Sequence, residues 1–151
     1  MSIATRLAVL FEPIGEQPPA RTLADDVADL RRLAWEGLYR EDEVREVLRA
    51  VRDDRRLDEV AQRSGKLVSR YCAMRRELNR IGSPELQPFA TALSEVFDYL
   101  AQLLHHAVAL LGSSWRSEEL RAQQRRVGGI GRQGERLRGI AAELSRLKSE
   151  A

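Results

Sequence analysis

The chain has 151 residues, 43% of them hydrophobic and 32% charged, which suits one domain with a sizeable core and excludes disorder throughout. Its 25 basic and 23 acidic side chains leave a formal net charge of +2, too small for a dedicated nucleic-acid binder. Cys72 is the single cysteine, so no internal disulfide can form and we expect a cytoplasmic location.

Residues 1–21 precede the main helical pattern. They consist of a short amphipathic segment followed by a loop that is rich in proline and glycine, which prevent regular structure. Thr22 then has the side chain of a helix N-cap, with Asp25 and Asp26 placed well for the helix dipole. We expect residues 22–148 to form a single helical domain.

Three interruptions divide the first part of this domain. The pattern loosens near residue 40, where Asp42 offers a new cap, and again across the charged run 53–56. The third, at residues 82–84, is the firmest: Gly82 is expected to end one helix, and Ser83 to cap the next with Pro84 at its first position.

The clearest helix is predicted over residues 84–111. Apolar side chains recur there at steps of three and four, which is the period of one buried helical face. We expect this helix to be central in the bundle, and the middle of the core to contain Leu93, Val96, Leu100 and Leu103.

Residues 116–148 form a final helical segment, capped by Ser114 or Ser117, in which apolar residues keep roughly heptad spacing. Its weakness is a cluster of glycines, because each costs an exposed helix interior about 1 kcal/mol relative to alanine. We expect this region to be a hinge, a close packing surface, or helical only when packed against a partner. The glycines are Gly128, Gly129, Gly131, Gly134 and Gly139.

Charge is distributed in blocks along the chain. Residues 22–59 and 81–115 carry an acidic excess, whereas residues 63–80 and 116–148 carry a basic excess. Such blocks suit antiparallel neighbours of opposite sign, within a bundle or between subunits. The alternative is a set of ordinary solvated faces, since exposed ion pairs contribute only about 0–1 kcal/mol each.

A G-x-G-x-x-G pattern occupies residues 129–134. This pattern binds dinucleotides when it joins a strand to a helix, but here it follows a polar helical stretch and no βαβ unit surrounds it. We therefore do not expect a nucleotide site.

Metal and nucleophile chemistry have weak support. Thr91, Glu95, Asp98, Gln102 and His105 form a polar seam on one helix, but the paired Glu-x-x-His motifs of di-iron bundles are missing. Cys72 has arginines nearby but no histidine, and a lone helical cysteine is usually a small buried hydrophobe. We expect no catalytic residue, no metal and no cofactor.

The arginine-rich stretches are stronger candidates for contact with a partner. They could contact phosphates or an acidic protein, but no aromatic residues interleave with them, which disfavours single-stranded nucleic acid. The residues that we predict to bind a partner are Arg121, Arg125, Arg126, Leu137, Ile140, Leu144 and Leu147.

The sequence thus predicts an all-α protein, an elongated antiparallel bundle of four to five helices. It resembles no family whose motifs can be assigned to its residues. The expected function is non-enzymatic: a scaffold, adaptor or regulatory subunit that binds a protein partner or a second copy, with no small-molecule substrate. The alternative is a bundle that binds nucleic acid or an anionic membrane through its arginines.

Overall fold

A computed structural model describes residues 21–147, and these form an all-helical bundle without strands. Segments 1–20 and 148–151, including the predicted amphipathic segment, lie outside the described residues. The helices are α2 (Leu23–Tyr39), α3 (Glu41–Arg52), α4 (Leu57–Leu78), α5 (Gln87–Ser113), α6 (Glu118–Arg125) and α7 (Arg132–Arg146), with short 3-10 helices η1 (Pro84–Leu86) and η2 (Ser114–Arg116).

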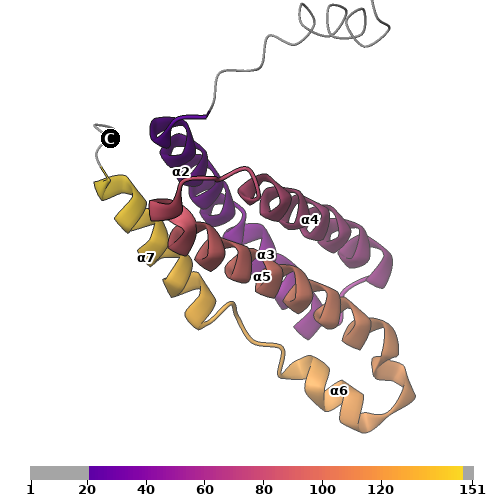
Figure 1. The fold of residues 1–151 in the computed structure, drawn as a ribbon. Helices are drawn as coiled ribbons and strands as arrows, with labels where there is room; N and C mark the ends of the chain where they lie inside the picture. Colours follow the sequence, from indigo (N-terminus) through magenta and orange to yellow (C-terminus); the bar gives the residue numbers. More distant parts are fainter. Residues whose placement is uncertain (1–20, 148–151) are drawn as a thin grey trace, which may run out of the picture.

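The helices make four antiparallel arms (Figure 1). The first arm is α2 followed by α3, the second is α4, the third is α5, and the fourth is α6 followed by α7. Arms that follow one another in the chain run in opposite directions, and α2 and α7 lie side by side at the same end of the elongated bundle. This arrangement confirms the predicted fold class.

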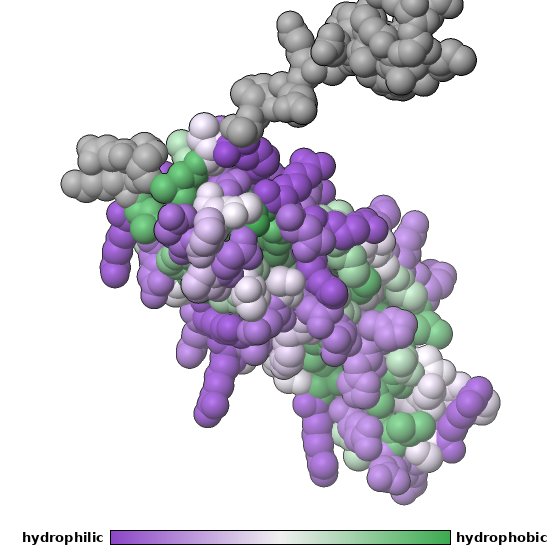
Figure 2. Space-filling model, viewed as in Figure 1, coloured by the Kyte–Doolittle hydropathy of each residue, from purple (hydrophilic) through white to green (hydrophobic). Residues whose placement is uncertain are grey.

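Helix α5 is central, as predicted, because it contacts α2, α3, α4, α6 and α7. Leu93, Val96 and Leu100 are completely buried, whereas Leu103 lies at the edge of the core and is only partly buried. On the face shown in Figure 2, hydrophilic side chains dominate, and hydrophobic ones are visible mainly in the seams between helices.

Local capping chemistry explains two of the helix starts. At α2, the Thr22 hydroxyl accepts from the backbone N–H of Asp25, and the Asp25 carboxylate accepts from the N–H of Thr22, which is a complete capping box. At α6, the Ser117 hydroxyl accepts from the N–H of Leu120 at 3.1 Å. Both caps agree with the sequence-based expectation.

Other predicted ends were wrong in detail. The break near residue 40 occurs at Arg40, but α3 begins at Glu41 without a side-chain cap, and Asp42 does not cap it. Helix α4 ends at Leu78 with Asn79 as its C-cap, well before Gly82. Ser83 makes no side-chain cap at η1 either, and its hydroxyl donates to Asp26 on α2.

The glycine cluster divides into two parts. Gly128, Gly129 and Gly131 lie in the non-helical connection between α6 and α7, and Gly131 adopts a positive φ of 63° that favours glycine. Gly134 lies inside α7, where a Cβ atom would stand 3.4 Å from Ile130 Cγ2 and 3.5 Å from Glu41 Oε1. The cluster is therefore a linker at its start. Gly134 and Gly139 lie within α7, where a Cβ atom would make ordinary contacts at Gly134 and none within 4 Å at Gly139.

The charge blocks meet as ion pairs between arms. Arg70 on α4 binds the Glu36 carboxylate on α2 through two nitrogens, which holds the pKa of Glu36 below its usual value. Further pairs join neighbouring helices at 2.5–2.9 Å, namely Arg63 with Glu46, Arg75 with Asp98, Arg136 with Glu95 and Arg32 with Glu77. Most of these side chains are substantially exposed, so their contribution is to helix register more than to stability.

Candidate functional site

A groove of about 680 Å³ lies where the corner between α2 and α3 faces α7, and nonpolar surface makes up most of its lining. The nine lining residues come from these three helices: Trp35, Leu38, Glu41, Asp42, Arg45, Arg138, Ala141, Ala142 and Ser145. Apart from Arg138, helix α7 contributes only small side chains here, and the groove is open to solvent. We name this surface the Trp35 groove.

Trp35 is the largest apolar side chain of the groove and is 59% exposed. Tyr39, one helical turn further along α2, is 78% exposed. Large aromatic side chains supply much of the energy at protein interfaces, because they remove a large apolar area from water at small entropic cost. Trp35 lines the groove, whereas Tyr39 lies outside its lining and exposes a second aromatic ring near this end of α2.

Glu41 lines the groove and is unusually buried for a glutamate. Its side chain is only 3% exposed; Oε2 accepts from Arg45 at 3.1 Å and lies 3.9 Å from an Arg138 nitrogen. Its other oxygen, Oε1, has no hydrogen-bond donor among residues 21–147. A buried carboxylate oxygen without a donor is costly. Oε1 lies beside Gly134 of α7 and has almost no exposed surface, so this cost belongs to the packing of α3 against α7.

The structure places the predicted partner-binding residues in two different environments. Leu137 and Leu144 are fully buried and Ile140 is 8% exposed, because α7 packs this stripe against the core of its own chain. Leu147 is partly buried beside the same core. The stripe therefore packs against the core of its own chain, whereas the sequence predicted that these four residues bind a partner.

Arg121, Arg125 and Arg126 are exposed at the α6 end of the bundle. No carboxylate of residues 21–147 lies within 4 Å of their guanidinium groups, in contrast to the paired arginines of α4. These three arginines remain open to an acidic or phosphate-bearing partner.

The polar seam of α5 is used for packing. Glu95 accepts from Arg136 of α7 at 2.7 Å, and Asp98 accepts from Arg75 of α4 at 2.7 Å and from Gln102 at 2.9 Å. Within residues 21–147, no three His, Cys, Asp or Glu side chains gather in an arrangement that could hold a metal ion. The two carboxylates of this seam thus bind arginines of the neighbouring helices.

Cys72 is exposed on α4, although a lone helical cysteine was expected to be buried. It occupies the outer face of α4, because the core positions around it are taken by Tyr71 and Met74, both fully buried. Cys72 is therefore exposed because it lies off the apolar face of α4.

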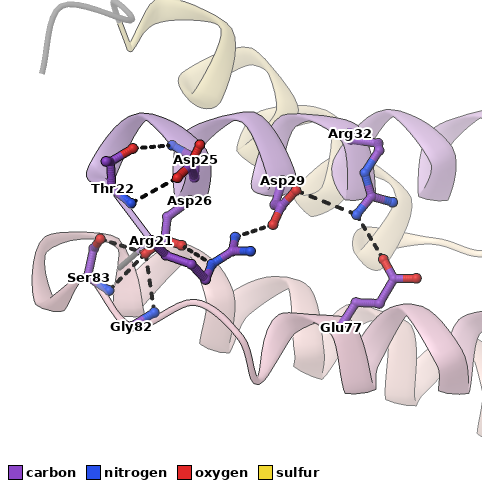
Figure 3. A network of polar contacts seen from close by, with 9 residues as sticks. All are labelled: Arg21, Thr22, Asp25, Asp26, Asp29, Arg32, Glu77, Gly82 and Ser83. Carbon is purple, nitrogen blue, oxygen red and sulfur yellow. Dashed lines mark hydrogen bonds and ion pairs between the residues drawn. The ribbon is translucent and has the colours of Figure 1, made fainter. Parts of the chain in front are cut away.

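Asp26 is the centre of a buried polar network at the other end of α2 (Figure 3). Its side chain is 2% exposed and accepts from Arg21, from the N–H groups of Gly82 and Ser83, and from the Ser83 hydroxyl. Both carboxylate oxygens have protein donors, so this network joins α2 to the turn between α4 and α5 and leaves no open position for a ligand.

Sequence reasoning missed both Trp35 and Glu41. Trp35 carried a usable signal, since it lies off the apolar stripe that contains Leu30, Leu33 and Ala34, so a large aromatic residue was displaced toward the surface of its helix. Glu41 carried none, because its burial arises from α7, far away in the sequence.

Comparison of the chain with protein-family models, with curated proteins and with solved structures finds no match. Among residues 21–147, no helix has the length and apolar character needed to cross a membrane.

Proposed function

We propose that this chain is a non-enzymatic helical adaptor or regulatory subunit that binds a protein partner, or a second copy of itself, through the Trp35 groove. The observation that carries the proposal is the exposed Trp35 indole at an open, mainly apolar groove. A large aromatic side chain beside arginines, here Arg45 and Arg138, is typical of a binding hot spot. The cytoplasmic location that we propose rests on the single cysteine.

The test compares two exposed tryptophans. Trp35→Ala removes the exposed indole of the groove. Trp115→Ala removes an indole that is 69% exposed in η2, which directly follows α5 and does not line the groove. Sedimentation velocity of the purified protein measures self-association, and capture from native lysate followed by mass measurement of the intact complex measures partner binding.

We expect Trp35→Ala to weaken association by about thirtyfold or more, the cost of about 2 kcal/mol that defines a hot-spot residue. Trp115→Ala should leave association unchanged, and both variants should keep the circular dichroism spectrum of the wild type. Equal association by both variants would show that the Trp35 groove is not the interface.

A second candidate function is binding to nucleic acid or an anionic membrane. It is supported by Arg121, Arg125 and Arg126, which are exposed and unpaired within residues 21–147. If it holds, binding to duplex DNA or to anionic vesicles should fall steeply with salt concentration. Changing the three arginines to glutamate should then abolish that binding while Trp35→Ala leaves it intact.

A further inference from the structure

The connection between α6 and α7 lies against α3 and encloses a small pocket of about 140 Å³. The lining consists of three arginines and a leucine of α3 together with the start of the connection: Arg45, Leu48, Arg49, Arg52, Val127, Gly128 and Gly129. Gln124, which is 3% exposed, holds α6 here by donating to Val51 O at 2.8 Å and to Asp54 Oδ1 at 3.0 Å.

The pocket is cationic. Arg45, Arg49 and Arg52 are spaced by four and three residues, so they share one face of α3, and no carboxylate of the described chain is part of the lining. Arg45 already donates to Glu41 and Asp42. Arg52 is 3.8 Å from the exposed Asp53, and Arg49 has no carboxylate of residues 21–147 within 4 Å, so these two remain available to an anion.

Neither packing nor backbone conformation requires glycine at the two pocket positions Gly128 and Gly129. A Cβ atom on Gly128 would meet only Arg126 O, at 4.0 Å, and one on Gly129 would meet nothing within 4 Å. Neither residue has a positive φ. Within residues 21–147, neither backbone N–H has an acceptor. Two residues whose N–H groups have no protein acceptor therefore line the same pocket as the arginines of α3.

We propose that this pocket binds a phosphoryl group, either as inorganic phosphate or as the phosphate monoester of a small molecule. Guanidinium groups present paired N–H donors that match phosphate oxygens, and backbone N–H groups of a glycine-rich turn add further donors. The size of the pocket suits a single such group. Of the G-x-G-x-x-G pattern, only Gly129 lines this pocket, so the proposed site uses the start of the connection and needs no βαβ unit. Arg45 lines both this pocket and the Trp35 groove, but Trp35 itself lines only the groove.

The test uses the full chain, labelled with ¹⁵N, and inorganic phosphate as the probe, at constant ionic strength maintained with sodium chloride. We expect the amide resonances of Gly128 and Gly129 to shift and to saturate with added phosphate. Arg49→Gln and Arg52→Gln should each weaken binding by about tenfold or more, the usual cost of losing a charge-assisted hydrogen bond.

Three variants serve as controls. Arg76→Gln changes an exposed arginine of α4 that has no ion pair within residues 21–147 and should leave binding unchanged. Gly129→Ala keeps the N–H group in open space and should also bind. Trp35→Ala should bind phosphate normally, so failure of the proposed function and failure of this site can be distinguished.

A parallel titration separates the sources of the phosphoryl group by comparing glycerol 3-phosphate with vesicles that contain phosphatidic acid. Saturable shifts with inorganic phosphate and glycerol 3-phosphate support the proposal. Binding to the vesicles alone would overturn it, as would equal shifts with sodium chloride, or affinities of the Arg49→Gln and Arg52→Gln variants equal to that of the wild type.

Discussion

The Asp26 carboxylate on α2 receives two hydrogen bonds from Ser83, one from its hydroxyl at 2.6 Å and one from its backbone N–H at 3.0 Å. These residues are 57 positions apart in the sequence. Burial alone would raise the pKa of Asp26, but the hydrogen bonds from Ser83 and Arg21 outweigh it, and the pKa lies below its ordinary value of 3.8. The ionised carboxylate thus joins the start of α2 to the turn between α4 and α5.

Asp26→Asn should lower the free energy of unfolding by about 1–3 kcal/mol, because an amide presents two donors where Asp26 accepts and leaves buried N–H groups without a full partner. Urea denaturation at pH 7 measures the change. Asp42→Asn is the matched control, since the Asp42 side chain is 90% exposed, and we expect it to change stability by less than about 0.5 kcal/mol.

The same substitution has an expected pH dependence. A carboxyl group whose pKa is lowered by folding stabilises the protein above the unfolded pKa, and this stabilisation is lost as the pH falls through the folded value. The difference between wild type and Asp26→Asn should therefore be largest near neutral pH and should shrink below about pH 4. A difference that stays constant down to pH 2 would contradict the role of the ionised carboxylate.

Two glycine substitutions should have opposite signs. At Gly37, a Cβ atom would stand 2.6 Å from Phe97 Cε1 in the core, so Gly37→Ala should destabilise the protein by about 1–3 kcal/mol through overpacking. At Gly65, on the exposed face of α4, nothing lies within 4 Å, and Gly65→Ala should stabilise by about 0.4–1 kcal/mol. Thermal unfolding of both variants checks the pair, and melting temperatures that change in the same direction would refute this packing.

Leu100→Ala should cost about 2–5 kcal/mol, because Leu100 is completely buried at the middle of α5. Leu103→Ala, on the same helix but partly exposed, should cost clearly less. Chemical denaturation of both variants measures the contrast. Equal costs would mean that the core of the bundle extends to the Leu103 edge of α5.

Amide hydrogen exchange should separate the α6–α7 connection from α7 itself. In the isolated protein at low concentration, we expect residues 128–131 to exchange rapidly, because they lie outside helices and their N–H groups lack backbone partners within residues 21–147. Amides near Leu137 and Leu144 should be protected, because both side chains are fully buried. Rapid exchange throughout α7 would show instead that it is ordered only by a partner.

Much of the fold could be predicted from local patterns. The steps of three and four in α5 identify its buried face, and Thr22 and Ser117 cap helices where their side-chain chemistry predicts. The same reasoning failed at Ser83. To cap its own helix, its hydroxyl would have to accept from a backbone N–H there, but it donates to the Asp26 carboxylate of another helix instead. Local chemistry cannot predict this contact, because the Asp26 carboxylate is brought to Ser83 only by folding.

The sequence by itself determined the helical class, the positions of most breaks and the apolar face of each helix, because these depend on residues within a few turns of one another. Only the tertiary structure decided which surfaces remain open. The apolar residues of α7, such as Leu137, are buried in the core of the same chain, whereas Trp35 is exposed. Glu41 is buried by α7, and Gly128 and Gly129 line a pocket together with arginines of α3. Which side chains stay exposed, and which residues of different helices come together, depends on how the helices pack. The periodicity of one helix does not specify which helix will pack against it.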